Sequence, residues 1–175
     1  SVAFYDNDYK DFIETEMTGF TMTGLMKFVY KNLDDVNIKG SEIKANFNLS
    51  DNLTAQFGFN NSKGRQDGKR LTTVDPDQAI LGLLWNSDDS KLSINTYARI
   101  TDGSPQSLPP VCGRTPPCAD ALTLPDHTLI DSFISYSINE KFSMRLAIRN
   151  ITDKKYWNWS DVAGSAANDS ALDYF

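Results

Sequence analysis

The sequence has 175 residues, of which 40% are hydrophobic and 23% charged, and a formal net charge of −6. This composition suits one folded domain, while the acidic balance and the lack of a basic stripe argue against nucleic acid as a partner. The longest apolar run covers residues 80–85, which is too short for a membrane-spanning helix and excludes a helical membrane protein. The chain opens on Ser1 inside a strand pattern, so we expect a piece of a longer protein whose targeting signal lies upstream.

Alternation of apolar and polar residues predicts about seven β-strands, because successive side chains of a strand point to opposite faces. The expected strands cover residues 2–14, 25–49, 53–60, 77–86, 92–100, 128–138 and 141–150. The first of them is the weakest pattern. The last shows the rule well, since Met144, Leu146 and Ile148 share one face while Arg145 and Arg149 lie on the other. The sequence therefore predicts an all-β protein with antiparallel strands.

The connections between these strands alternate between short and long. The short ones follow residues 49, 85 and 138 and are rich in Asp, Asn and Ser, whose side chains satisfy turn backbone. The long ones cover residues 11–24, 61–76, 101–127 and 152 onward, and they contain all seven prolines. Short turns at one end and long loops at the other are typical of outer-membrane β-barrels.

A soluble secreted β-sandwich also alternates apolar and polar residues, so the periodicity alone fits both architectures. Two features favour the barrel. The polar face carries Ser, Thr, Asn, Gln and Gly beside Arg and Lys, as a hydrated lumen would. Near the short turns lie four aromatic residues, where a girdle at the membrane interface would be expected, although each alone fits ordinary core packing: Phe47, Trp85, Tyr136 and Phe142.

Residues with catalytic or metal-binding chemistry are sparse. His127 is the only histidine; an axial haem ligand is conceivable there, but a solvated loop residue is the commoner case, and we assign it no role. The Asp34-Asp35 and Asp88-Asp89 pairs are typical of solvated turns. No nucleophile elbow, HExxH motif or phosphate-binding glycine loop occurs, so neither an enzyme nor a metal site is expected.

Cys112 and Cys118 lie in the longest connection, in the stretch CGRTPPC. Two cysteines so close together in a proline-rich loop predict a local disulfide bridge if the protein reaches an oxidising compartment. A ring of this size contributes roughly 2 kcal/mol, which stiffens the loop itself. Metal binding is the weaker interpretation, because no further thiol or imidazole lies beside the pair.

The stretch RNITDKKYWNWSDVAG at residues 149–164 resembles the last-hairpin signature of TonB-dependent outer-membrane receptors. The matching positions are Asn150, Ile151, Asp153, Lys154 and Tyr156. The extension at 157–161, followed by Gly164, is more similar to the haem and haemoglobin receptor branch than to the siderophore branch. Upstream stretches at residues 9–14, 32–59, 62–85 and 126–150 are similar in order and spacing to the terminal barrel strands of that family. The resemblance covers nearly the whole chain.

This resemblance implies a fold, a location and partners. Residues 1–175 would be the C-terminal part of a 22-stranded transmembrane barrel, strands fifteen to twenty-one, without the plug domain and the last strand. The intact receptor would sit in the outer membrane of a Gram-negative bacterium and contact its lipid. It would bind haem or a haemoglobin-type carrier outside and meet the TonB complex through the plug. Alone, the chain should not transport anything.

Ligand contacts are expected in the long connections, because aromatic and arginine side chains dominate binding hot spots. The candidates are Lys69, Arg70, Tyr156, Trp157 and Trp159. Tyr156 and Trp157 also fit rim aromatics that anchor a barrel edge. The chain itself needs no cofactor, and haem would be the cargo. A siderophore receptor, a passive porin and a soluble β-sandwich remain as alternative functions.

Overall fold

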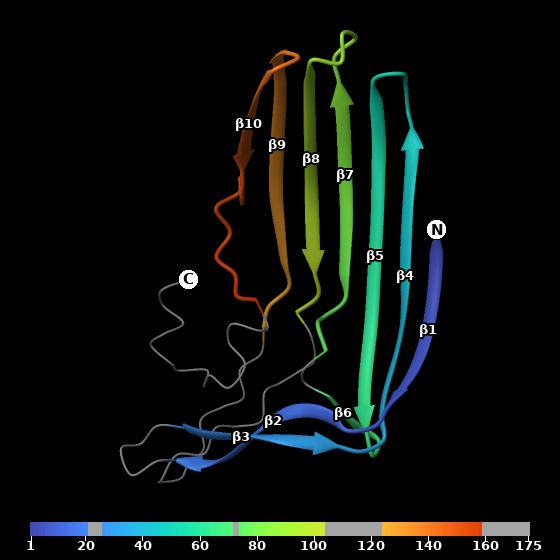
Figure 1. Cartoon of the computed structure of the whole chain (residues 1–175), viewed down its shortest axis with the longest axis vertical. Coiled ribbons are helices and arrows are strands. Elements are labelled where there is room, and N and C mark those ends of the chain that lie inside the picture. Colours follow the sequence, from blue (N-terminus) through green and yellow to red (C-terminus); the bar gives the residue numbers. More distant parts are fainter. Residues whose placement is uncertain (21–25, 72–73, 104–123, 159–175) are drawn as a thin grey trace. The chain divides into compact units, whose positions relative to one another are not determined.

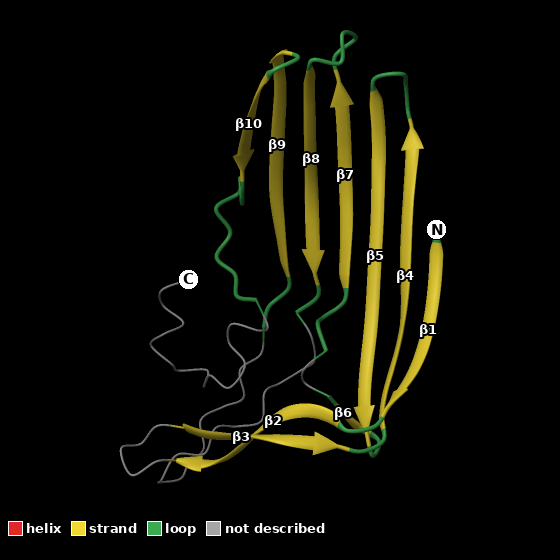
Figure 2. Ribbon diagram, in the orientation of Figure 1, coloured by secondary structure: helices red, strands yellow, loops and turns green. Residues whose placement is uncertain are grey.

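The computed structural model describes residues 1–20, 26–71, 74–103 and 124–158 (Figure 1). The regular structure of these residues is β-strand (Figure 2), and a helix long and apolar enough to cross a membrane is absent from them. The strands are β1 (Val2–Tyr9), β2 (Phe12–Phe20), β3 (Met26–Leu33), β4 (Val36–Asn48), β5 (Leu53–Gln66), β6 (Lys69–Arg70), β7 (Gln78–Asn86), β8 (Leu92–Thr101), β9 (His127–Asn139) and β10 (Phe142–Ile148).

Seven strands follow one another across the main sheet in the order β1-β4-β5-β7-β8-β9-β10, and the short β6 pairs with β5. The pairs from β5 to β10 are antiparallel. Strands β2 and β3 form a separate antiparallel hairpin. The prediction of an all-β chain with about seven main antiparallel strands is therefore confirmed.

The strand boundaries before residue 76 were partly wrong. The expected strand 25–49 is two strands, β3 and β4, which part at Asp34 and Asp35, where Asp35 has a φ of 56°. The expected connection 11–24 contains β2, and the connection 61–76 contains the end of β5 and β6. Asp67 and Gly68 turn β5 into β6 with φ of 47° and 75°. Left-handed backbone at Asp and Gly makes such tight hairpins possible, and alternation alone does not reveal them.

The chain divides into two compact units. The large unit comprises residues 1–3, 41–61 and 76–175, and the small unit comprises 4–40 and 62–75. Strands β7 to β10 belong wholly to the large unit, while β2, β3 and β6 belong to the small one. Strands β1, β4 and β5 each contribute residues to both units.

The register of the large unit aligns apolar side chains of neighbouring strands on one face. One row of directly paired residues crosses five strands from β5 to β10: Leu53, Trp85, Ile94, Ile134 and Leu146. The row Asn86, Ser93, Ser135 and Arg145 lies on the opposite face. A shift of one residue in any pairing would mix the two faces. The observed register therefore keeps the apolar row and the polar row on opposite faces, as the sequence predicts.

The apolar face of the large unit is exposed. Leu81, Leu83 and Leu146 keep 50%, 52% and 55% of their surface accessible. Leu81 and Leu83 share their face of β7 with Trp85, and the strands lie side by side in a single layer (Figure 1). Among the described residues of this unit no second sheet covers them. The soluble sandwich, which would bury this face between two sheets, is therefore wrong for the large unit.

The small unit contains the buried apolar cluster of the described residues. Leu33, Val36, Leu71 and Val74 pack together, with Phe12 and Ile38 against them. Val36 is completely buried. Gly64 lies so close that a Cβ atom built on it would be 2.6 Å from Val74 Cγ2. Here the apolar side chains are removed from water by other side chains.

Candidate ligand-binding surface beside the long connections

The short turns of the large unit gather at one end of its strands (Figure 1). Asn52, in the β4–β5 turn, donates from Nδ2 to the carbonyl of Asn86 at 2.9 Å and to the Asp88 carboxylate at 2.6 Å. In the β9–β10 turn, Asn139 Oδ1 accepts from the backbone N–H groups of Lys141 at 2.9 Å and Phe142 at 3.0 Å. Polar side chains thus satisfy the turn backbone, as expected for Asp, Asn and Ser.

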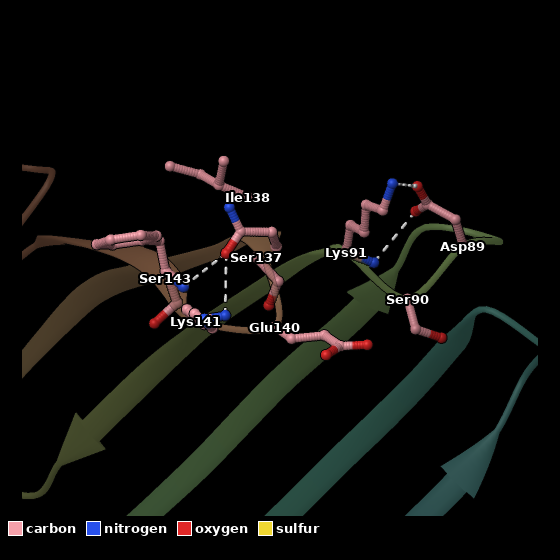
Figure 3. A pocket seen from close by; sticks show the side chains of 10 residues that line it. Asp89, Ser90, Lys91, Ser137, Ile138, Glu140, Lys141 and Ser143 are labelled. Carbon is pink, nitrogen blue, oxygen red and sulfur yellow. Dashed lines mark hydrogen bonds and ion pairs between the residues drawn. The ribbon is translucent and has the colours of Figure 1, made fainter.

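A pocket lies between the β7–β8 and β9–β10 turns (Figure 3). Its charges are partly paired, since Lys91 Nζ lies 3.7 Å from Asp89 Oδ2. The Ser87 hydroxyl donates to Asp89 Oδ1 at 2.6 Å and is the main cause that lowers the pKa of this carboxyl, followed by the Lys91 backbone N–H. These contacts stabilise a turn and offer no convergent set of ligand-binding groups.

The opposite end of the strands leads into the long connections. Gly103 N–H donates to Asp126 Oδ1 at 2.6 Å, which brings the two ends of the β8–β9 connection together. A Cβ atom on Gly103 would lie 2.3 Å from the Asp126 nitrogen, so only glycine fits. Asp102 N–H donates to the carbonyl of Asp77 at 2.9 Å. Hydrogen bonds from the backbone N–H groups of Asp102 and Gly103 therefore fix the bases of these connections.

After β10 the chain forms a closed turn at Asn150. The Asn150 side chain accepts from Lys154 N–H and donates to the Lys154 carbonyl, both at 3.0 Å. Asn150 and Asp153 both have a φ of 49°, a left-handed conformation that these residue types tolerate well. Ile151 N–H donates to the carbonyl of Ile130 on β9 at 2.8 Å. The motif that the sequence singled out is thus a rigid turn attached to the sheet.

This turn leads into a small surface pocket that we call the Tyr156 site. Its lining residues are Asn150, Asp153, Lys154, Lys155, Tyr156, Trp157 and Asn158. The Tyr156 ring stacks on His127 at the start of β9, with 5.1 Å between centroids and 29° between planes. Two lysines beside stacked aromatic rings suit a ligand that is flat and anionic.

The polar face of β8 and β9 adjoins this end. Tyr97 and Phe133 stack with their centroids 5.7 Å apart. Arg99 Nη2 lies 3.7 Å from Asp131 Oδ2, and the Asp131 side chain is almost fully buried. No pattern in the sequence assigns a role to His127, Arg99 or Asp131. The alternation placed Asp131 on the polar face, but only the pairing register shows that it meets Arg99 and Asn150.

The predicted ligand-contact residues belong to different units of the chain. Tyr156 and Trp157 lie together in the Tyr156 site. Lys69 and Arg70 form β6 in the small unit, where their backbone pairs with Gln66 and Arg65. Trp159 and the predicted Cys112–Cys118 bridge lie outside the described residues. Ligand contact by any of these residues stays a prediction, and the described part of the chain holds no cluster of three metal-binding side chains.

Comparison with known proteins gives a family match. The family model "TonB dependent receptor-like, beta-barrel" matches residues 1–151. The ferrioxamine B receptor of Salmonella typhimurium is 28% identical over 138 residues, which are 73% of this chain and 19% of that protein. A probable hemoglobin and hemoglobin-haptoglobin-binding protein 4 of Haemophilus influenzae is 23% identical over 143 residues, 75% of this chain and 14% of that protein. The chain spans less than a fifth of these relatives.

Solved structures share the fold. The copper transporter OprC superposes with a TM-score of 0.69 at 17% identity, covering 90% of this chain and 23% of that one. The pyoverdine outer membrane receptor FpvA from Pseudomonas aeruginosa, bound to pyoverdine, superposes with a TM-score of 0.62 at 23% identity, covering 89% and 23%. At these identities the likeness concerns the fold alone.

Proposed function

The chain belongs to the TonB dependent receptor-like β-barrel family, and we propose that it forms part of the wall of an outer-membrane receptor that imports iron bound to a carrier. The observation that carries this proposal is the apolar row from Leu53 to Leu146, which is continuous across five strands. A lipid-facing barrel wall needs such a surface, and exposure of so many large apolar side chains to water would be unfavourable.

The proposed receptor places each part of the chain in a distinct environment. The apolar face contacts the hydrocarbon of a Gram-negative outer membrane, and the polar face borders the lumen. The seven main strands supply about a third of a 22-stranded wall. The plug domain, which belongs to the intact receptor and lies outside this sequence, meets the TonB complex. The long connections face the outside and carry the ligand contacts, with Tyr156 and Trp157 as the main candidates.

We infer that the carrier is haem or a haem protein. The support is the resemblance of residues 157–161 to the haem branch, together with the named haemoglobin-binding relative. A siderophore is the second candidate, favoured by the ferrioxamine B receptor among the relatives. The Tyr156 site favours haem of the two, because haem is flat and carries two anionic propionate groups that Lys154 and Lys155 could meet. No catalytic role is proposed for any residue.

Growth of an iron-limited strain that lacks its own iron-carrier receptors tests this function. The full-length receptor should restore growth on haemin or haemoglobin as the sole iron source, and only when the TonB protein is present. Growth on ferrioxamine B instead would assign the siderophore function. A passive porin would act without TonB, and the same growth in both backgrounds would contradict the receptor proposal. A Tyr156→Ala variant should need more haemin for the same growth, while a Glu140→Ala control in a short turn should not.

A further inference from the structure

Asp131 is a buried carboxylate to which the proposed function gives no role. It lies near the start of β9 on the polar face and keeps only 5% of its surface accessible. A buried carboxylate is costly unless hydrogen bonds and opposite charge compensate its lost hydration. Its partners therefore indicate what the residue does.

The two carboxylate oxygens of Asp131 have different partners. Oδ1 accepts from the backbone N–H of Asn150 at 2.7 Å. Oδ2 lies 3.7 Å from Nη2 of Arg99 on the neighbouring strand β8. A hydrogen bond from a backbone N–H to a carboxylate is stronger than one between neutral groups. The closer contact is thus the one to the turn that follows β10, and Arg99 supplies the balancing charge.

Asn150 connects Asp131 to the segment that follows β10. Its backbone is held by Asp131, and its side chain closes the turn through two bonds to Lys154. The next residues, Lys155 to Trp157, line the Tyr156 site. Besides the Asp131 bond, the sheet holds this turn through Ile151 N–H and the ring contact between His127 and Tyr156.

We propose that Asp131 is the positioning residue of the Tyr156 site: it fixes the Asn150 turn on the sheet, and Arg99 holds its carboxylate in place. This inference rests on the proposed function in one respect, namely that residues 154–157 contact the ligand. The position of the segment itself can be measured without any ligand. The inference predicts that loss of Asp131 displaces residues 150–158 while the sheet stays intact.

Asp126 offers a matched control. It is also an aspartate whose Oδ1 accepts a backbone N–H, that of Gly103 at 2.6 Å, and it lies at the same end of the sheet. It belongs to the β8–β9 connection, and its carboxylate accepts from Gly103 and not from the Asn150 turn. An Asp126→Ala variant therefore removes the same kind of bond from a different segment.

The test uses the full-length receptor in detergent micelles and amide hydrogen exchange. In Asp131→Ala, exchange in residues 150–158 should rise about tenfold, the equivalent of one such bond, with β7 and β8 unchanged. Asp131→Asn keeps an acceptor oxygen for Asn150 N–H and should restore most of the protection. Asp126→Ala should leave residues 150–158 as in the wild type. Unchanged exchange in Asp131→Ala, or a rise throughout the sheet, would overturn the positioning role.

A binding arm separates this role from the proposed function. Haemin and ferrioxamine B serve as probes, and the affinity of whichever binds should fall about tenfold in Asp131→Ala, with little further loss when Tyr156→Ala is added. Additive losses would overturn the positioning role. If the wild type binds neither probe, the proposed ligands are wrong, and the exchange measurement alone decides the role of Asp131.

Discussion

The two units of the chain differ in how their main apolar clusters are packed, although both also expose single apolar side chains, such as Phe4 and Tyr30 in the small unit. In the small unit, Leu33, Val36, Leu71 and Val74 are buried against one another. In the large unit, Leu81, Leu83 and Leu146 stay about half exposed, although they are aligned across paired strands. The small unit therefore has an apolar core of its own, whereas the aligned apolar face of the large unit is the surface proposed to contact lipid. The small unit can serve as a reference when this proposed lipid contact is tested.

The largest effect should come from a charge on the apolar face of the large unit. Leu81→Arg places a guanidinium in the middle of β7, and at the bilayer midplane this costs about 2–4 kcal/mol. The free energy of unfolding, measured by urea titration of the full-length receptor in phospholipid vesicles, should fall by that amount. Gln56→Arg lies on the polar face, one strand away, and serves as the control. Equal losses for both variants would contradict the assignment of the faces.

The next effect belongs to the small unit and should not depend on lipid. In Gly64→Ala the new methyl group meets Val74 and Leu71 at 2.6 and 3.0 Å, and overpacking of this kind costs about 1–3 kcal/mol. Gly58 is the matched control, because its nearest neighbour would be Ile80 Cβ at 3.6 Å, an ordinary contact. Hydrogen exchange of β3 and β6 should accelerate in Gly64→Ala, in micelles and vesicles alike. Acceleration of exchange in only one of the two media would contradict the independence of the small unit from lipid.

A smaller effect is expected at the β9–β10 turn, where the proposed lipid contact of the large unit ends. Asn139→Ala removes the acceptor of two backbone N–H groups and should cost about 1 kcal/mol. Glu140→Ala in the same turn removes no bond that stabilises the backbone and should be close to neutral. Urea unfolding in vesicles measures both variants. If the turn lies in water, Asn139→Ala should lower the free energy of unfolding by the same amount in micelles and in vesicles. A much larger loss in vesicles would show that the turn lies inside the membrane.

The smallest effect concerns pH at the β7–β8 turn. The pKa of Asp89 is lowered, chiefly by the Ser87 hydroxyl and then by the Lys91 N–H. A lowered pKa in the folded state stabilises the turn above the ordinary carboxyl pKa, and this is lost as pH falls below about 4. In Ser87→Ala the titration midpoint of Asp89, followed by carboxyl NMR in micelles, should move upward. An unchanged midpoint would exclude the hydroxyl as the main cause.

The fold of the large unit was predictable because one face had to be apolar throughout. Period-two alternation fixes which side chains share a face, and the turns rich in Asp, Asn and Ser fix where strands reverse. The small unit was less predictable. The Asp34-Asp35 pair was predicted to be a solvated turn, and it is exposed in the β3–β4 turn, but the expected strand 25–49 ran through it because the alternation continues on both sides of that turn.

The candidate site was predictable only where a motif marks it. The stretch from Asn150 to Trp157 drew attention to the Tyr156 site, and the structure brings Tyr156 and Trp157 together there. Its supports come from residues far away in sequence. Asp131 and His127 lie on β9, and contact with the Asn150 turn and Tyr156 depends on the β9–β10 register. No local pattern in the sequence contains that information.

Nitroxide scanning of β10 in the full-length receptor tests the central point most directly. Cys112 and Cys118 would be replaced by serine, and a spin label would be placed at each position from Ser143 to Ile148 in phospholipid vesicles. Labels at Met144, Leu146 and Ile148 should collide with oxygen dissolved in the lipid, whereas the positions between them should be reached by a water-soluble nickel complex. The same accessibility at neighbouring positions, or oxygen access at Arg145 in place of Leu146, would contradict a large unit whose apolar face is solvated by the membrane.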